Sequence, residues 1–125
     1  MAQRFPIKFD PAYRVLSTIV LVPPSDSYLE VDGDRVYVRM AWGFRARFPK
    51  SAVRSVAPYG RRPMSRGVHG FARRWLVNGS GQGILSIKLD PPARAYVTGF
   101  PIRLRELLIS LEDPDAARAM LTPTT

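Results

Sequence analysis

Cysteine is absent from the 125-residue sequence, and His69 is its only histidine. The first absence excludes disulfide bonds and thiolate metal ligands, and the second leaves any zinc site dependent on carboxylates. We therefore expect no metal and no other cofactor. A chain without disulfides also fits an intracellular protein.

Long apolar segments are absent as well. The longest spans residues 15–22 and includes Ser17 and Thr18, whereas a membrane-spanning helix needs about 20 apolar residues. Residues 1–10 mix charged and apolar side chains and do not resemble a signal peptide. These features predict a cytoplasmic protein, either free or attached to the surface of a membrane.

Acidic residues are absent from the middle of the chain. Residues 35–75 contain eleven basic residues and no acid, whereas the whole chain has 19 basic and 10 acidic residues. Codon usage in a GC-rich genome would explain why only three of the basic residues are lysine, but not why the acids are missing. The alternative is a basic face for an acidic protein, anionic lipid headgroups or nucleic acid. The residues predicted for this face are Arg45, Arg47, Arg54, Arg61, Arg62, Arg66, Arg73 and Arg74.

Groups that would support catalysis are few. His69 is the one candidate general base, with Ser65 or Ser80 as nucleophile, but no acid lies between Asp34 and Asp90 to orient it. We therefore predict a protein without catalytic residues, and a hydrolase is among the less favoured interpretations.

The glycine-rich segment Asn78–Gly83 resembles a phosphate-binding loop in composition only. Phosphate-binding loops lead into a helix and end in Gly-Lys-Ser/Thr. Here a strand pattern follows, and that ending is missing. We predict a hairpin turn at this position.

What the chain does contain is the pattern of a sheet protein. Twelve prolines and nine glycines provide many turns, and 46% of the residues are hydrophobic. The clearest unit is a hairpin, in which Tyr28–Val31 and Arg35–Met40 alternate in polarity on either side of Asp32–Gly33–Asp34. The other predicted strands are 5–9, 42–48, 52–57, 73–77, 84–89, 93–98 and 102–111, with Trp42, Phe44 and Phe48 in the core.

The connections are predicted from the breaks in this alternation. Residues 58–72 have no periodicity and are predicted as a long loop, and Asp90–Pro92 is predicted as a turn. In the last strand the apolar residues change parity, which predicts a β-bulge near Arg105–Glu106.

Two helices complete the prediction. Asp113–Pro114–Asp115 is a typical helix start, so a short helix should follow the last strand. Residues 11–21 are predicted as a helix after Asp10–Pro11, with a strand as the alternative because many of them are β-branched. The chain is therefore expected to be one mainly β domain, residues 1–125, with a frayed tail at 122–125. Its seven or eight short strands would form a small bent antiparallel sandwich or partly open barrel, closed by the C-terminal helix.

Several segments resemble known proteins. Tyr28–Arg39, Phe44–Val56 and Arg105–Asp115 resemble the early strands and the last strand and helix of bacterial pleckstrin-homology (PH)-like domains. The chain is also similar to a group of small actinobacterial proteins without an assigned activity, through Arg74–Gly81 and Arg103–Pro114. In PH domains that bind phosphoinositides, lysine and arginine at the first hairpin hold the phosphates. The corresponding turn here, Asp32–Gly33–Asp34, carries two acids instead.

Taken together, these features favour a binding or adaptor domain that presents its basic region, residues 35–75, to an acidic protein partner or an anionic membrane surface. The alternative is a carrier that holds a small apolar ligand or lipid inside a barrel. Nucleic-acid binding is less favoured, because no recognition helix and no aromatic sheet signature is visible.

Overall fold

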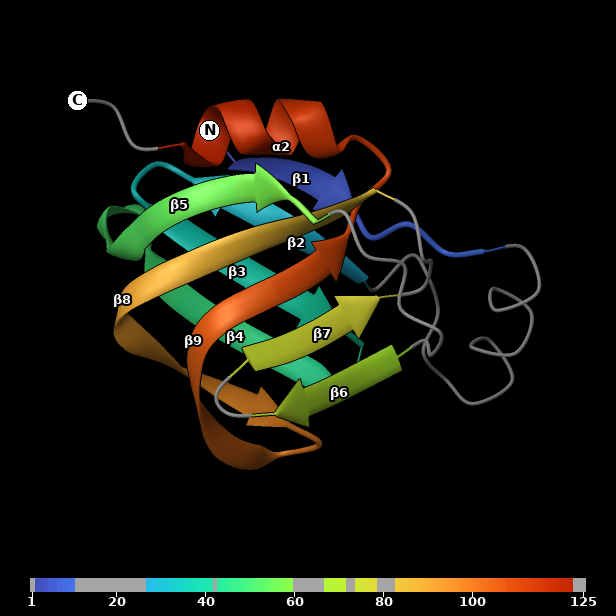
Figure 1. The fold of residues 1–125 in the computed structure, drawn as a ribbon, viewed down its shortest axis with the longest axis vertical. Coiled ribbons are helices and arrows are strands. Elements are labelled where there is room, and N and C mark those ends of the chain that lie inside the picture. The colour runs from blue at the N-terminus through green and yellow to red at the C-terminus, as the bar shows by residue number, and fades with distance from the viewer. Residues whose placement is uncertain are drawn as a thin grey trace.

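A computed structural model describes residues 2–10, 27–41, 43–59, 67–71, 74–78 and 83–122, with the backbone alone for 67–71 and Asn78. The described residues form nine strands, one 3₁₀ turn and one α-helix (Figure 1). The mainly β fold with a short C-terminal helix is thus confirmed. The elements are β1 (Ala2–Pro6), β2 (Ser27–Asp32), β3 (Arg35–Met40), β4 (Phe44–Pro49), η2 (Lys50–Ala52), β5 (Val53–Pro58), β6 (Gly67–Phe71), β7 (Arg74–Asn78), β8 (Ile84–Val97), β9 (Phe100–Ser110) and α2 (Pro114–Leu121).

The strands form one bent sheet that does not close into a barrel. Its order is β1-β2-β3-β4-β8-β9-β7-β6, and β5 pairs with β8 beside this path. The long β8 connects two layers: residues 95–97 pair with β4, and residues 85–89 pair with β5. In Figure 1 the first four strands cross behind β5, β8, β9 and β7, and α2 covers one end.

The core lies between these two layers. Alternation along β2, β3 and β4 places apolar side chains inward, and Leu29, Val36 and Phe44 have no exposed surface. The expected core residues Phe44 and Phe48 are confirmed as buried, and Trp42 lies outside the described residues. Ala117 and Leu121 of α2 are fully buried and close the covered end.

The predicted turn at Asp90–Pro92 is wrong, because β8 runs through it. The Asp90–Pro91 peptide bond is cis, and the register with β9 shifts between Lys88 and Ala93. On β9, Leu104 lies opposite Ala93 and Glu106 lies opposite Lys88. The irregularity is therefore where the change of parity in the last strand predicted a bulge. Its extra residues belong to β8, where proline is tolerated because a bulge needs no ladder hydrogen bond.

The predicted hairpin between residues 73–77 and 84–89 is also wrong. β9 lies between β7 and β8, and β7 pairs with it in parallel, Trp75 opposite Leu107 and Val77 opposite Ile109. Within the predicted loop 58–72, Gly67–Phe71 is a strand that pairs with β7. Two glycines hide its alternation, and backbone hydrogen bonds hold it in the sheet.

The N-terminal strand is displaced from its predicted range of 5–9. β1 ends at Pro6, and the chain then meets the end of β9, where the Lys8 N–H donates to the Ser110 carbonyl at 2.9 Å. The predicted helix 11–21 and residues 123–125 of the predicted tail lie outside the described residues. Thr122 is held at the end of α2, because its N–H donates to the Arg118 carbonyl at 2.9 Å.

Among the described residues, no helix is both long enough and apolar enough to cross a membrane.

Candidate anion-binding face

The outward-pointing residues of the first layer form a basic and aromatic surface. β2, β3, β4 and the second half of β8 alternate, so that each apolar residue turned inward is followed by a polar one turned outward. These outward residues line a groove of about 390 Å³. We call this surface the arginine–tyrosine face; it consists of Tyr28, Glu30, Tyr37, Arg39, Arg45, Arg47, Arg94 and Tyr96.

The strand register brings like charges together on this face. Arg39 on β3 lies directly opposite Arg45 on β4, and Arg94 on β8 lies directly opposite Arg103 on β9. Like charges in directly opposite positions destabilise a sheet. Arg94 and Arg103 have no described partner, so their pairing costs folding free energy, and packing does not require arginine at exposed positions.

Tyrosine rings position two of the guanidinium groups. The Arg45 guanidinium carbon lies 5.5 Å from the Tyr96 ring centroid, and that of Arg47 lies 5.4 Å from the Tyr37 centroid. Both distances are within the range of cation–π attraction. Such contacts orient a guanidinium group without neutralising its charge.

The single acid of the face is already paired. Glu30 accepts from the Arg4 Nε at 2.8 Å, and the Arg4 guanidinium lies 4.2 Å from the Tyr28 ring centroid. Within the described part of the chain, no carboxylate lies within ion-pair distance of Arg45, Arg47 or Arg94. The positive charges of Arg45, Arg47 and Arg94 are thus left for a ligand.

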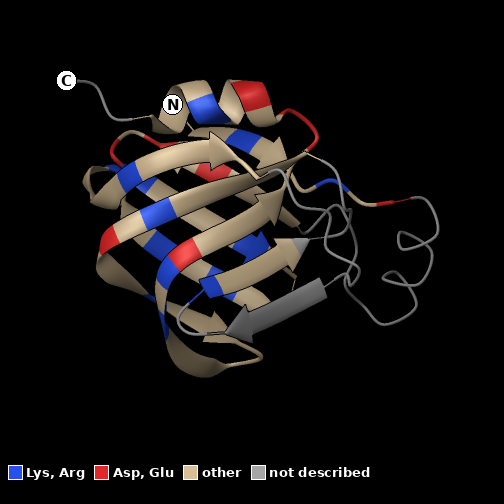
Figure 2. Cartoon of the chain, viewed as in Figure 1, with Lys and Arg blue, Asp and Glu red and all other residues tan. Residues whose placement is uncertain are grey.

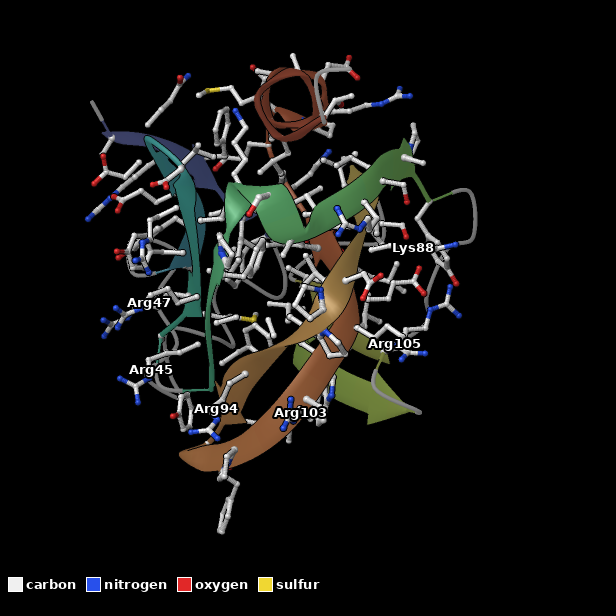
Figure 3. The ribbon with its side chains drawn as sticks, turned by 90° about the vertical axis from the view of Figure 1, so that its left-hand side faces the viewer. Arg45, Arg47, Lys88, Arg94, Arg103 and Arg105 are labelled. Atoms are coloured by element: carbon white, nitrogen blue, oxygen red, sulfur yellow. The ribbon has the colours of Figure 1, made fainter. Side chains whose placement is uncertain are left out.

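The predicted basic residues do not form one cluster. Arg45 and Arg47 lie on the arginine–tyrosine face. Arg54 was expected beside them, but β5 pairs with the first half of β8, so Arg54 belongs to the second layer. Figure 3 shows Arg45, Arg47 and Arg94 pointing to one side, and Lys88 and Arg105 to the opposite side. Arg61, Arg62, Arg66 and Arg73 lie outside the described residues.

Two basic residues of the second layer have intramolecular partners. The Arg54 Nε is 3.9 Å from the Asp90 carboxylate, and its guanidinium donates to the Ser51 carbonyl at 3.2 Å. The Arg74 Nε is 3.1 Å from the Glu106 carboxylate. The groove on this side is lined by acids as well as bases: Arg54, Lys88, Leu89, Asp90, Arg105 and Glu106. Its net charge is therefore smaller than that of the arginine–tyrosine face.

The sequence-based prediction did not include Arg94 and Tyr96 in the face. Arg94 and Tyr96 alternate with Ala93, Ala95 and Val97, which was enough to place both outward. What the alternation did not show is that this segment pairs with β4, Arg45 opposite Tyr96. That pairing joins segments that are far apart in the sequence, and it completes the groove.

The three candidate catalytic side chains lie outside the described part of the structure. His69 lies on β6, where only its backbone is described, and Ser65 and Ser80 lie outside the described residues. The hydrolase interpretation therefore rests on the sequence alone.

Comparison with known proteins yields no match: no family model fits the sequence, and neither a curated protein nor a solved structure matches it significantly.

Proposed function

We propose that the protein is a non-enzymatic binding module that presents the arginine–tyrosine face to an anionic partner, either an acidic protein or the headgroups of a membrane. The observation that carries the proposal is that Arg45, Arg47 and Arg94 line one groove and have no carboxylate partner among the described residues. A carboxylate or phosphate between such arginines would relieve their repulsion. The guanidinium group also matches the planar geometry of these anions.

The chemistry around these arginines supports the same conclusion. Arg45 and Arg47 are held against tyrosine rings and have no described carboxylate partner. Their N–H groups therefore remain available to an incoming acceptor. Tyrosine hydroxyl groups beside them can donate further hydrogen bonds.

We also propose that the bent sheet belongs to the PH-like kind of architecture. The two layers joined by β8 and β9, with a C-terminal helix over one end, support this proposal. The turn Asp32–Gly33–Asp34 would repel phosphates there. In this protein the anion would bind on the outer surface of the sheet instead of at the first hairpin.

The carrier alternative has no support among the described residues. Side chains from both layers fill the space between them, including Phe44, Phe48 and Met40, all at most 1% exposed. The two grooves described above lie on outer surfaces, not inside the sheet.

Nuclear magnetic resonance with poly-L-glutamate as the anionic probe tests the proposed function. Addition of the polymer to isotope-labelled protein should shift the backbone amide signals of residues 37–39, 45–47 and 94–96. The triple variant Arg45→Gln, Arg47→Gln, Arg94→Gln should bind about tenfold more weakly, because exposed ion pairs each contribute up to about 1 kcal/mol.

A matched control separates the face from net charge. Lys88→Gln, Arg105→Gln, Arg118→Gln removes the same number of charges from exposed positions outside the face and should bind almost as well as the parent. Equal weakening in the two triple variants would show that only the overall charge matters, and the proposal would then fail.

A further inference from the structure

The tip of the β8–β9 hairpin carries an exposed aromatic side chain. Phe100 is 73% exposed and is the one large apolar residue with such exposure among the described residues. It lies directly opposite Val97 across the two-residue turn Thr98–Gly99. Ile102 and Leu104 lie on the same side of β9 as Phe100 and point toward the core, whereas Phe100 lies beyond the end of the core.

This tip is held in place by the neighbouring turn. The Thr98 N–H donates to the Gly43 carbonyl at 3.0 Å, which ties the β8–β9 turn to the β3–β4 turn. Thr98 and Gly99 have φ values of 48° and 89°, the left-handed conformations that tight hairpin turns require. Phe100 is therefore presented by a fixed backbone.

Among the described residues, the neighbours of the tip include basic side chains and no acidic ones. Residues 39–45 and 94–103, which contain the strand ends and turns at this end, have no Asp or Glu. Arg103 is three residues from Phe100, about 10 Å along the strand. Figure 3 shows Arg45, Arg94 and Arg103 near the same end.

Acidic residues gather at the other end of the molecule. Asp32 and Asp34 lie at the β2–β3 turn, which is at the opposite end of β3 from the β3–β4 turn. Asp113 and Asp115 lie at the start of α2, which covers that end. In Figure 2 the described part of the lower end carries Lys and Arg but no acid. The described residues of the tip end are thus basic without acids, whereas acids and bases lie together at the other end.

We propose that the β8–β9 hairpin docks on an anionic lipid bilayer, with Phe100 inserted at the headgroup boundary and Arg45, Arg94 and Arg103 bound to lipid phosphates. The proposal rests on the proposed function, because two of these arginines belong to the arginine–tyrosine face. It adds a partner, an orientation and an apolar anchor.

The shape of the tip favours a bilayer over a protein. A protein partner would need a pocket that matches the protruding Phe100, whereas the boundary of a bilayer accepts an aromatic ring at any position. This difference between the two ends would turn the basic tip toward an anionic surface and the acidic turn away from it.

Co-sedimentation with vesicles tests the proposal. Vesicles of phosphatidylcholine mixed with phosphatidylglycerol should bind the protein, and vesicles of phosphatidylcholine alone should bind it far more weakly. Phe100→Ser should weaken binding to the anionic vesicles about tenfold or more, because it removes the burial of a whole aromatic side chain. Circular dichroism should show an unchanged fold, since Phe100 is exposed.

Insertion is measured directly with Phe100→Trp. The tryptophan fluorescence that this variant adds to that of the parent should be quenched by anionic lipids with brominated acyl chains. Met120→Ser, on α2 at the opposite end, is the control and should bind anionic vesicles like the parent.

Two results would overturn this inference and leave the proposed function intact. One is binding to anionic vesicles that Phe100→Ser does not weaken, with no quenching of Phe100→Trp. The other is no binding to vesicles while poly-L-glutamate still shifts the signals of the arginine–tyrosine face, which would point to an acidic protein. Failure of both probes would overturn the proposed function itself.

Discussion

Gly83 shows how a single residue controls where the chain can pass. Its φ is +67°, and a Cβ atom built there would lie 2.5 Å from the Leu111 carbonyl oxygen. The Leu111 N–H also donates to the Gly83 carbonyl at 2.9 Å. This position joins the start of β8 to the chain after β9, and the backbone of Leu111 leaves no room for a side chain.

Gly83→Ala should therefore destabilise the fold more than Gly33→Ala. Both glycines have positive φ, but a Cβ at Gly33 would meet nothing within 4 Å. We expect Gly33→Ala to lower the free energy of unfolding by about 1 kcal/mol, the cost of the left-handed conformation. Gly83→Ala should cost at least about 2 kcal/mol, because the backbone must also move. Equilibrium unfolding in urea measures both, and equal losses would contradict the contact with Leu111.

The arginine pairs make a second prediction at the scale of the residue. Arg94 and Arg103 are directly opposite each other, and neither has a described carboxylate partner. Arg103→Glu replaces repulsion by attraction, so it should raise the free energy of unfolding by about 0.5 to 1 kcal/mol. High salt should reduce this gain, because both groups are exposed.

The same variant should bind anionic vesicles more weakly than the parent. If the variant is more stable than the parent but binds anionic vesicles less well, the repulsion between Arg94 and Arg103 is retained for binding. A loss of stability in Arg103→Glu at low salt would instead show that the two guanidinium groups do not repel each other as the register implies.

Among the elements, α2 is one whose sequence signals were sufficient. Asp113 accepts a hydrogen bond from the Ala116 N–H at 3.2 Å, and Pro114 occupies the first turn. Ala117 and Leu121 are fully buried. Capping, proline position and apolar spacing all lie within a few neighbouring residues, so the sequence contains everything that fixes this helix.

Two substitutions separate the contributions to α2. Asp113→Ala removes the N-cap and should lower the free energy of unfolding by about 1 kcal/mol. Leu121→Ala leaves a cavity under the helix and should lower it by about 2 to 5 kcal/mol. Thermal unfolding checks the order of these effects. If Asp113→Ala were the more harmful, the helix would depend on its cap more than on its packing.

The strands divide according to how local their signals are. The β2–β3 hairpin was predictable because its turn and both alternating strands adjoin in the sequence. The β7–β9 pairing was not predictable. In the sheet β9 lies between β7 and β8, which the glycine-rich segment connects in the sequence. The candidate site divides in the same way. Alternation places Arg45 and Arg47 outward, but the addition of Arg94 depends on the long-range pairing of β4 with β8.

At the scale of the whole molecule, the two layers give two surfaces with the same kinds of residue and different electrostatics. On the second layer Arg54 and Arg74 face Asp90 and Glu106. On the arginine–tyrosine face of the first layer the one acid, Glu30, is paired with Arg4. An excess of arginine across residues 35–75 could not distinguish these surfaces, because the acids that compensate the second layer come from later in the chain.

Salt dependence separates the two parts of the proposed membrane contact. Binding through Arg45, Arg94 and Arg103 should weaken steeply as salt screens the anionic lipids, whereas burial of Phe100 should be nearly insensitive to salt. Phe100→Ser should therefore shift the plot of log affinity against log salt downward by about one unit without a change in slope. Arg45→Gln, Arg94→Gln, Arg103→Gln should reduce the slope instead. A changed slope in Phe100→Ser would mean that the ring contributes by positioning the arginines, and not by entering the bilayer.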